Sequence, residues 1–188
     1  PIKCTHSHGS PVALEEAIEQ SCNPYFWYLY RDMLHPNNNN SNNQFKQKYN
    51  DWRNYVLQFG FSQKFQDTDI GTQKSGSIPT QSYFDKIYGK KGWKAITIRS
   101  LSIGQGEILV TPLQLANQMA AIANDGYYIT PHLNKHDSML LHKHQIDIEP
   151  KYFEVVKKGM HRVMTYGTGR HYRIDGIEVA GKTGTAEN

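Results

Sequence analysis

Apolar side chains recur at helical spacing in several stretches of the chain, and this pattern predicts helices. The first predicted helix runs from about Val12 to Gln20, and helical spacing resumes after Pro24 in the sequence YFWYLYRDML. Longer helices are expected over residues 45–60 and 150–166. Because the residue before a proline disfavours helical geometry, residues 21–23 should form a junction between the first two helical segments.

A mostly apolar, buried helix is predicted from Thr111 and Pro112, since an N-cap hydroxyl and a proline in the first turn are typical of a helix start. It should end at residues 124–126. The asparagine-rich stretch 35–44 and the polar, glycine-containing stretch 62–82 are expected to be irregular. The final sequence, IDGIEVAGKTGTAEN, predicts a turn followed by one strand. Together these elements predict an α+β fold in which helices dominate.

Composition narrows the classes of function. The chain has 188 residues, of which 38% are hydrophobic, so it is long enough and apolar enough for one domain with a core. No apolar run reaches the length that crosses a bilayer. The formal net charge is +4, but Lys and Arg are scattered and form no zinc-finger, RNP or basic-helix pattern. The charge is therefore attributed to a solvated surface, and no nucleic-acid partner is expected.

Side chains suited to acyl chemistry occur at two places far apart in the sequence. A hydroxyl and an amide lie at the junction between the first helices, and an ammonium, two hydroxyls and a glycine lie on the late strand. A hydroxyl can pass protons, an amide can hold a peptide group, and an ammonium can stabilise charge or anchor a carboxylate. An exposed strand edge can accept a peptide as an added strand. The candidate site residues are Ser21, Asn23, Lys182, Thr183, Gly184 and Thr185.

Ser-x-Asn at residues 21–23, followed after a long interval by Lys-Thr-Gly at residues 182–184, resembles two motifs of the penicillin-recognising serine acyltransferases. The resemblance extends to the sequences PVALEEAIEQSCNPYF, SIGQGEILVTPLQLANQMAAIANDG, GTGR and VAGKTGTAEN. As an ordered series these are similar to the class B penicillin-binding proteins. The Gly-Gln-Gly of residues 104–106 before TPLQLA is most similar to the elongation-type members, typified by penicillin-binding protein 2.

The resemblance implies a peptidoglycan D,D-transpeptidase with the penicillin-binding, β-lactamase-like α+β fold. In this family a serine attacks the D-Ala-D-Ala carbonyl, and an amine from a neighbouring stem peptide resolves the acyl-enzyme. Carried over by motif, Ser21 would relay protons, Asn23 would hold an amide of the substrate, and Lys182 would supply positive charge near the nucleophile. No cofactor is implied.

The same resemblance implies how substrate and partners are bound. Thr183 and Thr185 would contact the substrate carboxylate, and Gly184 would leave room for the peptide. The implied ligands are stem peptides and β-lactams. The implied protein partners are a glycan-strand polymerase and the elongation machinery. The implied location is the periplasmic face of the bacterial inner membrane, with a single-pass anchor outside this chain.

One family motif is missing. The nucleophile normally lies in a Ser-x-x-Lys motif upstream of Ser-x-Asn, and no serine of this chain has a lysine three positions later. We therefore expect residues 1–188 to be part of a transpeptidase domain, without the nucleophile motif and without the strands that follow Lys-Thr-Gly. Such a piece would not acylate by itself.

Other functions share these motifs. A division-type transpeptidase is the nearest alternative, and only the Gly-Gln-Gly stretch argues against it. A β-lactamase or a β-lactam sensor is a further alternative, which the sequence SIGQGEILVTPLQLANQMA disfavours. A non-catalytic module that holds stem peptides would account for the absent Ser-x-x-Lys.

Cys4, His6, His8 and Cys22 are residue types that bind zinc. Their spacing matches no standard zinc finger, and alternate residues of a strand would point to opposite faces. Loop histidines and a buried thiol are therefore favoured, and no metal is predicted.

Overall fold

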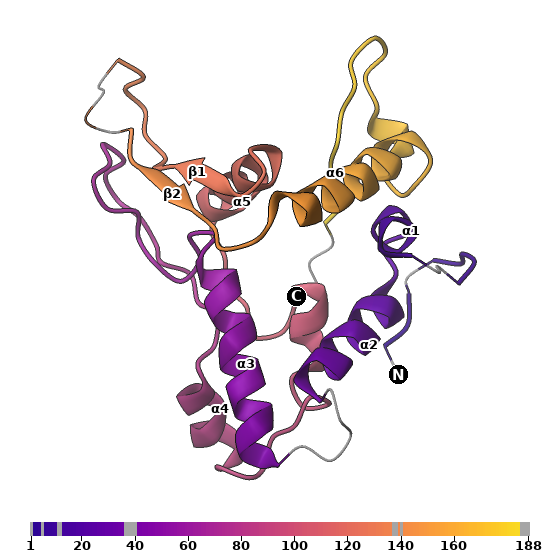
Figure 1. Cartoon of the computed structure of the whole chain (residues 1–188), viewed down its shortest axis with the longest axis vertical. Helices are drawn as coiled ribbons and strands as arrows, with labels where there is room; N and C mark the ends of the chain where they lie inside the picture. The colour runs from indigo at the N-terminus through magenta and orange to yellow at the C-terminus, as the bar shows by residue number, and fades with distance from the viewer. Residues whose placement is uncertain are drawn as a thin grey trace.

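The computed structural model describes residues 2–4, 6–10, 13–35, 41–136, 139 and 141–184. Helices dominate it, as Figure 1 shows. The α-helices are α1 (Leu14–Glu19), α2 (Asn23–Leu34), α3 (Asn42–Leu57), α4 (Gln81–Tyr88), α5 (Pro112–Ala123) and α6 (Pro150–Thr165). Short 3-10 helices, η1 (Arg99–Ile103) and η3 (Arg170–Tyr172), and an antiparallel pair, β1 (Tyr127–Ile129) and β2 (Lys143–Gln145), complete the secondary structure. The α+β prediction is confirmed.

The predicted helices form where local signals mark their ends. At Thr111 the side chain accepts a hydrogen bond from the Gln114 backbone N–H, and the Gln114 side chain accepts one from the Thr111 N–H. This capping box, with Pro112 in the first turn, starts α5 at the predicted residue. A second capping box at Ser41 starts α3, so residues 42–44 were wrongly assigned to the irregular asparagine-rich stretch. The first predicted helix is shorter than expected, and Val12 lies outside the described residues.

The aromatic stripe of α3 is core, as predicted. Phe45 and Tyr49 are buried against Trp93 and against Phe84 of α4. Helix α4 was not predicted, and residues 81–82 were wrongly assigned to the irregular stretch. Its apolar signal is too short for a periodicity argument, and burial of Phe84 in this core stabilises it.

A buried ion pair joins α3 to α4. Lys46 Nζ lies 2.6 Å from Asp85 Oδ1, and their side chains are 9% and 17% exposed. The same carboxylate accepts a hydrogen bond of 2.7 Å from Trp93 Nε1. The hydrogen bond from Lys46, followed by that from Trp93, lowers the pKa of Asp85 to about 2. The pair therefore remains ionised well below neutral pH.

Replacing Tyr30 with phenylalanine should leave stability unchanged or raise it, by up to ~1 kcal/mol. The Tyr30 hydroxyl is buried without a hydrogen-bond partner in the part of the chain that the structure describes. The matched control is Tyr49→Phe, because the Tyr49 hydroxyl donates to the Pro79 carbonyl at 2.7 Å. That change should cost about 1 kcal/mol. Thermal melts of the two variants test the difference, and an equal loss in both would contradict it.

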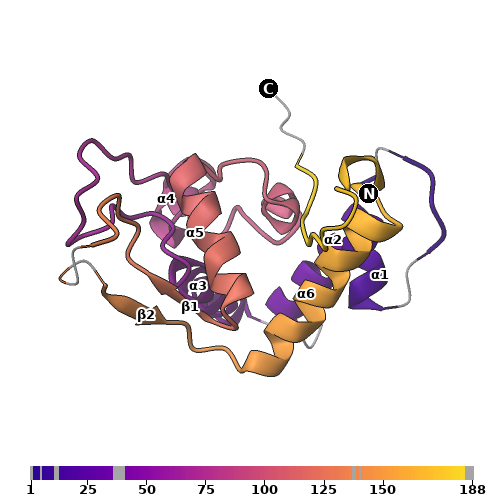
Figure 2. The ribbon, with the colours of Figure 1, turned by 90° about the horizontal axis from the view of Figure 1, so that it is seen from above.

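A second part of the core lies between α5 and the two-stranded sheet. Ala121 of α5, Tyr128 of β1 and Phe153 of α6 are buried there. The β1–β2 hairpin was not predicted, since strands of three residues carry no readable alternation. From above, α5 and the sheet lie on one side of the molecule and α1 and α6 on the other (Figure 2).

Helix α1 packs directly on α6. Gly159 makes this contact close, since a Cβ at that position would lie 2.9 Å from the Ile18 side chain. Glu19 at the end of α1 forms an ion pair of 2.5 Å with Arg162 of α6. The end of α1 is thereby placed beside the segment that follows α6.

The predicted C-terminal strand is not formed in the described residues. The segment 178–184 is extended, but it belongs to no sheet, and only an isolated bridge joins Ile174 to Ile177 ahead of it. A strand exists through hydrogen bonds to a neighbouring strand, and no described segment pairs with this one. It is held to α6 by a hydrogen bond from the Gly181 N–H to the Met160 carbonyl.

Among the described residues, none of the helices combines the length and the apolar character that a bilayer crossing requires.

Candidate active site

Ser21 occupies a tight turn between α1 and α2. Its φ of 51° lies in the left-handed region, which is uncommon for a residue with a side chain. The turn is closed by hydrogen bonds from the Ser21 N–H to the Ile18 carbonyl and from the Cys22 N–H to the Ala17 carbonyl. The predicted junction between two helical segments is confirmed at Ser21 and Cys22, whereas Asn23 is already the first residue of α2. The turn presents the Ser21 hydroxyl beyond the end of α1.

Lys182 reaches Ser21 across 161 positions of sequence. Its Nζ donates a hydrogen bond of 2.8 Å to Ser21 Oγ. It also lies 3.2 Å from the Thr183 carbonyl oxygen and 3.3 Å from Thr183 Oγ1. The Ser21 hydroxyl and the Lys182 ammonium therefore meet in the structure.

These groups open onto a pocket of about 630 Å³. Its walls come from the start of the chain, the turn at Ser21, the end of α6 with the loop after it, and the late extended segment. The lining residues are His6, Ser21, Met164, Thr168, Gly169, Tyr172, Val179, Gly181, Lys182, Thr183 and Gly184. The volume is in the range of small-ligand sites.

The loop after α6 aligns the two halves of the site, which are the turn at Ser21 and the segment that contains Lys182. The Thr168 N–H donates to the Glu19 carbonyl at 3.3 Å, which ties the loop to the end of α1. The Thr168 and Thr183 hydroxyl oxygens are 2.9 Å apart, which ties the same loop to the late segment. Gly167 permits this approach, since a Cβ there would lie 2.3 Å from the Glu19 carbonyl oxygen.

Lys182 has a depressed pKa. Although the residue as a whole is exposed, partial desolvation of its ammonium lowers the pKa of Lys182. A lower pKa increases the fraction of neutral amine near neutral pH, and the neutral amine can accept a proton. Lys182 and Ser21 therefore form a pair that can transfer a proton to or from a group in the pocket.

The other predicted site residues differ in their placement. Thr183 and Gly184 line the pocket, and a Cβ at Gly184 would meet nothing within 4 Å. Asn23 does not line it, and its Nδ2 instead donates to the Lys3 carbonyl at 3.1 Å. Thr185 lies outside the described residues.

Sequence reasoning assigned no role to several residues of the pocket. Thr168 and Gly169 belong to the sequence GTGR, which was noted for its resemblance only. Tyr172 follows in η3. His6, whose Nε2 lies 2.7 Å from the Gln20 carbonyl oxygen, was considered only as a metal ligand. The signal that could have pointed to Thr168 is its position between two glycines directly after a helix.

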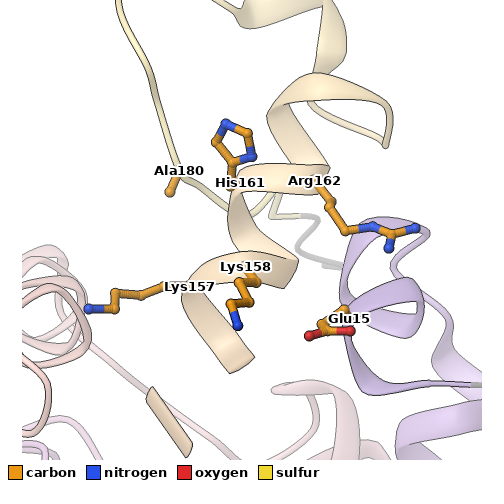
Figure 3. A pocket seen from close by; sticks show the side chains of 6 residues that line it. All are labelled: Glu15, Lys157, Lys158, His161, Arg162 and Ala180. Atoms are coloured by element: carbon orange, nitrogen blue, oxygen red, sulfur yellow. The ribbon is translucent and has the colours of Figure 1, made fainter. Parts of the chain in front are cut away.

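A second hollow, of about 530 Å³, lies between α1, α6 and the extended segment (Figure 3). Figure 3 shows the charged side chains of α6 around it, with Glu15 projecting from α1. Two of its cations are already paired, Arg162 with Glu19 and Lys157 with Asp125 at 2.6 Å. Its lining holds no hydroxyl or thiol nucleophile, so the Ser21–Lys182 pocket is the candidate active site.

Among the described residues, Cys4, His8 and Cys22 form a group that could hold a metal. Their ligand atoms lie within 4.8 Å of one another, and His8 Nε2 is 3.1 Å from Cys4 Sγ. The alternation argument against a site does not apply, because the described residues of 2–10 form no strand. Thiolate and imidazole ligands are typical of zinc. His6 is not in this group among the described residues.

Comparison with known proteins places the chain in a family. The model of the penicillin binding protein transpeptidase domain matches residues 2–188. The chain belongs to this family. Its predicted resemblance to penicillin-binding proteins is thereby confirmed. Ser21, Lys182, Thr183 and Gly184 line the pocket described above.

Several relatives of this penicillin-binding protein domain are named peptidoglycan D,D-transpeptidase MrdA. The peptidoglycan D,D-transpeptidase MrdA of Acinetobacter baumannii is 31% identical over 193 residues, which cover 96% of this chain and 26% of that protein. MrdA of Escherichia coli K12 is 25% identical over 192 residues, covering 96% and 28%. The chain thus spans about a quarter of the length of these relatives.

Solved structures show the same penicillin-binding protein fold. PBP2 from Helicobacter pylori has a TM-score of 0.71 at 25% identity, covering 93% of this chain and 30% of that one. PBP2 of Pseudomonas aeruginosa, solved in complex with WCK 5153, has a TM-score of 0.64 at 27% identity, covering 85% and 34%. The helices described here therefore match part of a larger transpeptidase fold.

Proposed function

We propose that this chain is part of a peptidoglycan D,D-transpeptidase of cell-wall elongation, which cross-links stem peptides through a serine acyl-enzyme. The observation that carries the proposal is the 2.8 Å hydrogen bond from Lys182 Nζ to Ser21 Oγ. It joins the two family motifs in one pocket. The identity to MrdA-type transpeptidases over 96% of the chain supports the elongation role over the division role.

In the proposed reaction, Ser21 and Lys182 handle protons. Ser21 Oγ accepts a hydrogen bond from the Lys182 ammonium, so its own proton is directed elsewhere in the pocket. A chain of two such groups can pass a proton between the nucleophile and the leaving amine. The ammonium also stabilises negative charge that develops on the attacked carbonyl group.

Substrate binding is proposed along the extended segment. A stem peptide would lie beside residues 182–184, where Gly184 leaves open space, and it would use backbone hydrogen bonds as an added strand does. The hydroxyls of Thr183 and Thr185 would bind its terminal carboxylate. Asn23, whose Nδ2 donates to Lys3, would offer its Oδ1 to an amide N–H of the substrate.

The nucleophile is proposed to lie in a Ser-x-x-Lys motif of the longer protein, upstream of Ser-x-Asn. The sequence printed here contains no such motif. The longer protein is proposed to be anchored in the inner membrane, with this domain in the periplasm as a β-lactam target. It would work beside a glycan-strand polymerase and other elongation proteins. A structure similar to this chain, PBP2 of Helicobacter pylori, was solved in complex with MreC, which supports such partners.

Covalent labelling by a fluorescent penicillin tests the proposal. The full-length protein should retain one label after denaturing electrophoresis, because its nucleophile forms a stable acyl-enzyme. The 188-residue chain alone should retain none. Stoichiometric labelling of the 188-residue chain would show that its own residues supply the nucleophile. A label that the full-length protein rapidly hydrolyses would favour a β-lactamase instead.

A further inference from the structure

The ion pair between Glu19 and Arg162 lies two residues from Ser21 and is shielded from water on its acidic side. The Glu19 side chain is 9% exposed, whereas that of Arg162 is 40% exposed. Both oxygens of the Glu19 carboxylate have a partner. Gln20 Nε2 donates to Oε1 at 2.7 Å, and Arg162 Nε donates to Oε2 at 2.5 Å. Because a buried carboxylate is costly without such partners, Arg162 holds Glu19 in one place.

The backbone of the same two residues holds the loop after α6. The Gly167 N–H donates to the Arg162 carbonyl at 2.9 Å, and the Thr168 N–H donates to the Glu19 carbonyl at 3.3 Å. Together with the ion pair, these bonds join the end of α1, helix α6 and the loop in a closed circuit of contacts. The end of α1 therefore cannot shift along α6 without the loss of one of these contacts.

Ser21 and Lys182 are attached to different sides of this circuit. Ser21 follows Glu19 by two residues, in the turn after α1. Lys182 is adjacent to Thr183, whose hydroxyl oxygen lies 2.9 Å from that of Thr168. The 2.8 Å hydrogen bond from Lys182 Nζ to Ser21 Oγ therefore depends on how firmly the circuit holds α1 against the loop. The ion pair is its strongest contact, because a hydrogen bond between charged groups is stronger than one between neutral groups.

We propose that Glu19 and Arg162 are positioning residues for the acyl-transfer reaction, and that their ion pair sets the distance between Ser21 Oγ and Lys182 Nζ. This inference rests on the proposed function and adds to it two residues that stand outside the Ser-x-Asn and Lys-Thr-Gly motifs. Neither residue is among those that line the Ser21–Lys182 pocket in the described part of the chain. Both therefore act through Ser21 and Lys182 and take no direct part in the chemistry.

The rate constant for labelling of the full-length protein by a fluorescent penicillin tests the proposal. In Glu19→Gln and in Arg162→Gln, labelling at saturating penicillin should slow by about tenfold, because a small displacement of reacting groups lowers the rate. The penicillin concentration that gives half of the maximal rate should change little, since neither residue lines the pocket. A loss of fold would instead lower the fraction of protein that becomes labelled, and that fraction is measured in the same experiment.

Further variants separate the pair from other effects. The double variant Glu19→Gln/Arg162→Gln should label no more slowly than the slower single variant, because both substitutions remove the same interaction. Arg162→Lys keeps the charge and should retain part of the rate. Lys157→Gln is the matched control, since it breaks another ion pair of α6, with Asp125 at 2.6 Å, and should label at the wild-type rate.

Four outcomes count against these assignments. Wild-type rate constants in both single variants would overturn the inference, and so would a tenfold loss in Lys157→Gln. Losses that multiply in the double variant would show that the two residues act independently, which also contradicts a role for the pair. A wild-type protein that penicillin does not label would instead overturn the proposed function, so the two failures are distinct.

Discussion

Replacing Lys182 with alanine in the full-length protein should slow acylation by a fluorescent penicillin by about 10²- to 10⁴-fold, the range expected when a group that transfers protons is removed. The substitution deletes the Nζ that lies 2.8 Å from Ser21 Oγ. It also removes the ammonium charge from the pocket that Ser21 lines. The rate of label incorporation at saturating and subsaturating penicillin measures the loss.

Matched variants separate chemistry from folding. Lys158→Ala removes an exposed lysine of α6 and should label at the wild-type rate. Lys182→Arg keeps the charge and should retain more activity than Lys182→Ala. A thermal melt of each protein reports any loss of fold. Labelling of Lys182→Ala at the wild-type rate would contradict the role proposed for this residue.

Replacing Gln114 with leucine should lower the free energy of unfolding by about 3 kcal/mol or more, because several buried polar groups lose their partner at once. Gln114 is 1% exposed. Its Nε2 lies 3.2, 3.1 and 2.8 Å from the carbonyl oxygens of Gly60, Gln63 and Ser75. Its Oε1 accepts from the Thr111 N–H in the capping box. A loss of this size lowers Tm by roughly 6–12 °C for a domain of this length.

Gln118→Leu is the matched control for that prediction. Gln118 lies on the same helix but is only partly buried, and among the described residues its side chain forms no hydrogen bond. Its replacement should shift Tm by far less. Thermal melts followed by tryptophan fluorescence compare the two proteins. Equal shifts would mean that the hydrogen bonds of Gln114 contribute little to stability.

Much of the helical structure was predictable because its signals are local. The start of α5 follows from Thr111 and Pro112, whose hydroxyl and ring act within one turn of backbone. The length of α6 follows from apolar spacing between Pro150 and Thr165. The turn near Ser21 was predicted from Pro24, although Asn23, directly before that proline, is the first residue of α2.

Other elements depend on contacts that no local pattern reveals. Helix α4 is stabilised by burial of Phe84 against Trp93 and against Tyr49, which comes from the distant helix α3. The strands β1 and β2 pair across a long loop, and each is too short to show alternation. The extended segment 178–184 was wrongly predicted as a strand, because a strand also needs a neighbour to supply hydrogen bonds.

The candidate site also has features that the sequence predicted and features that only the tertiary structure revealed. By itself the sequence determined which chemical groups are available, since Ser21, Lys182 and Thr183 stand in motifs that resemble a known family. Only the tertiary structure decided that Lys182 contacts Ser21, that Thr168 bridges the two halves, and that Asn23 turns toward Lys3. The physical reason is that the type of a residue influences the backbone conformation only within a few positions of that residue. The contact across 161 residues instead depends on how α1 packs against α6, through Gly159 and Ile18 and through the Glu19–Arg162 pair.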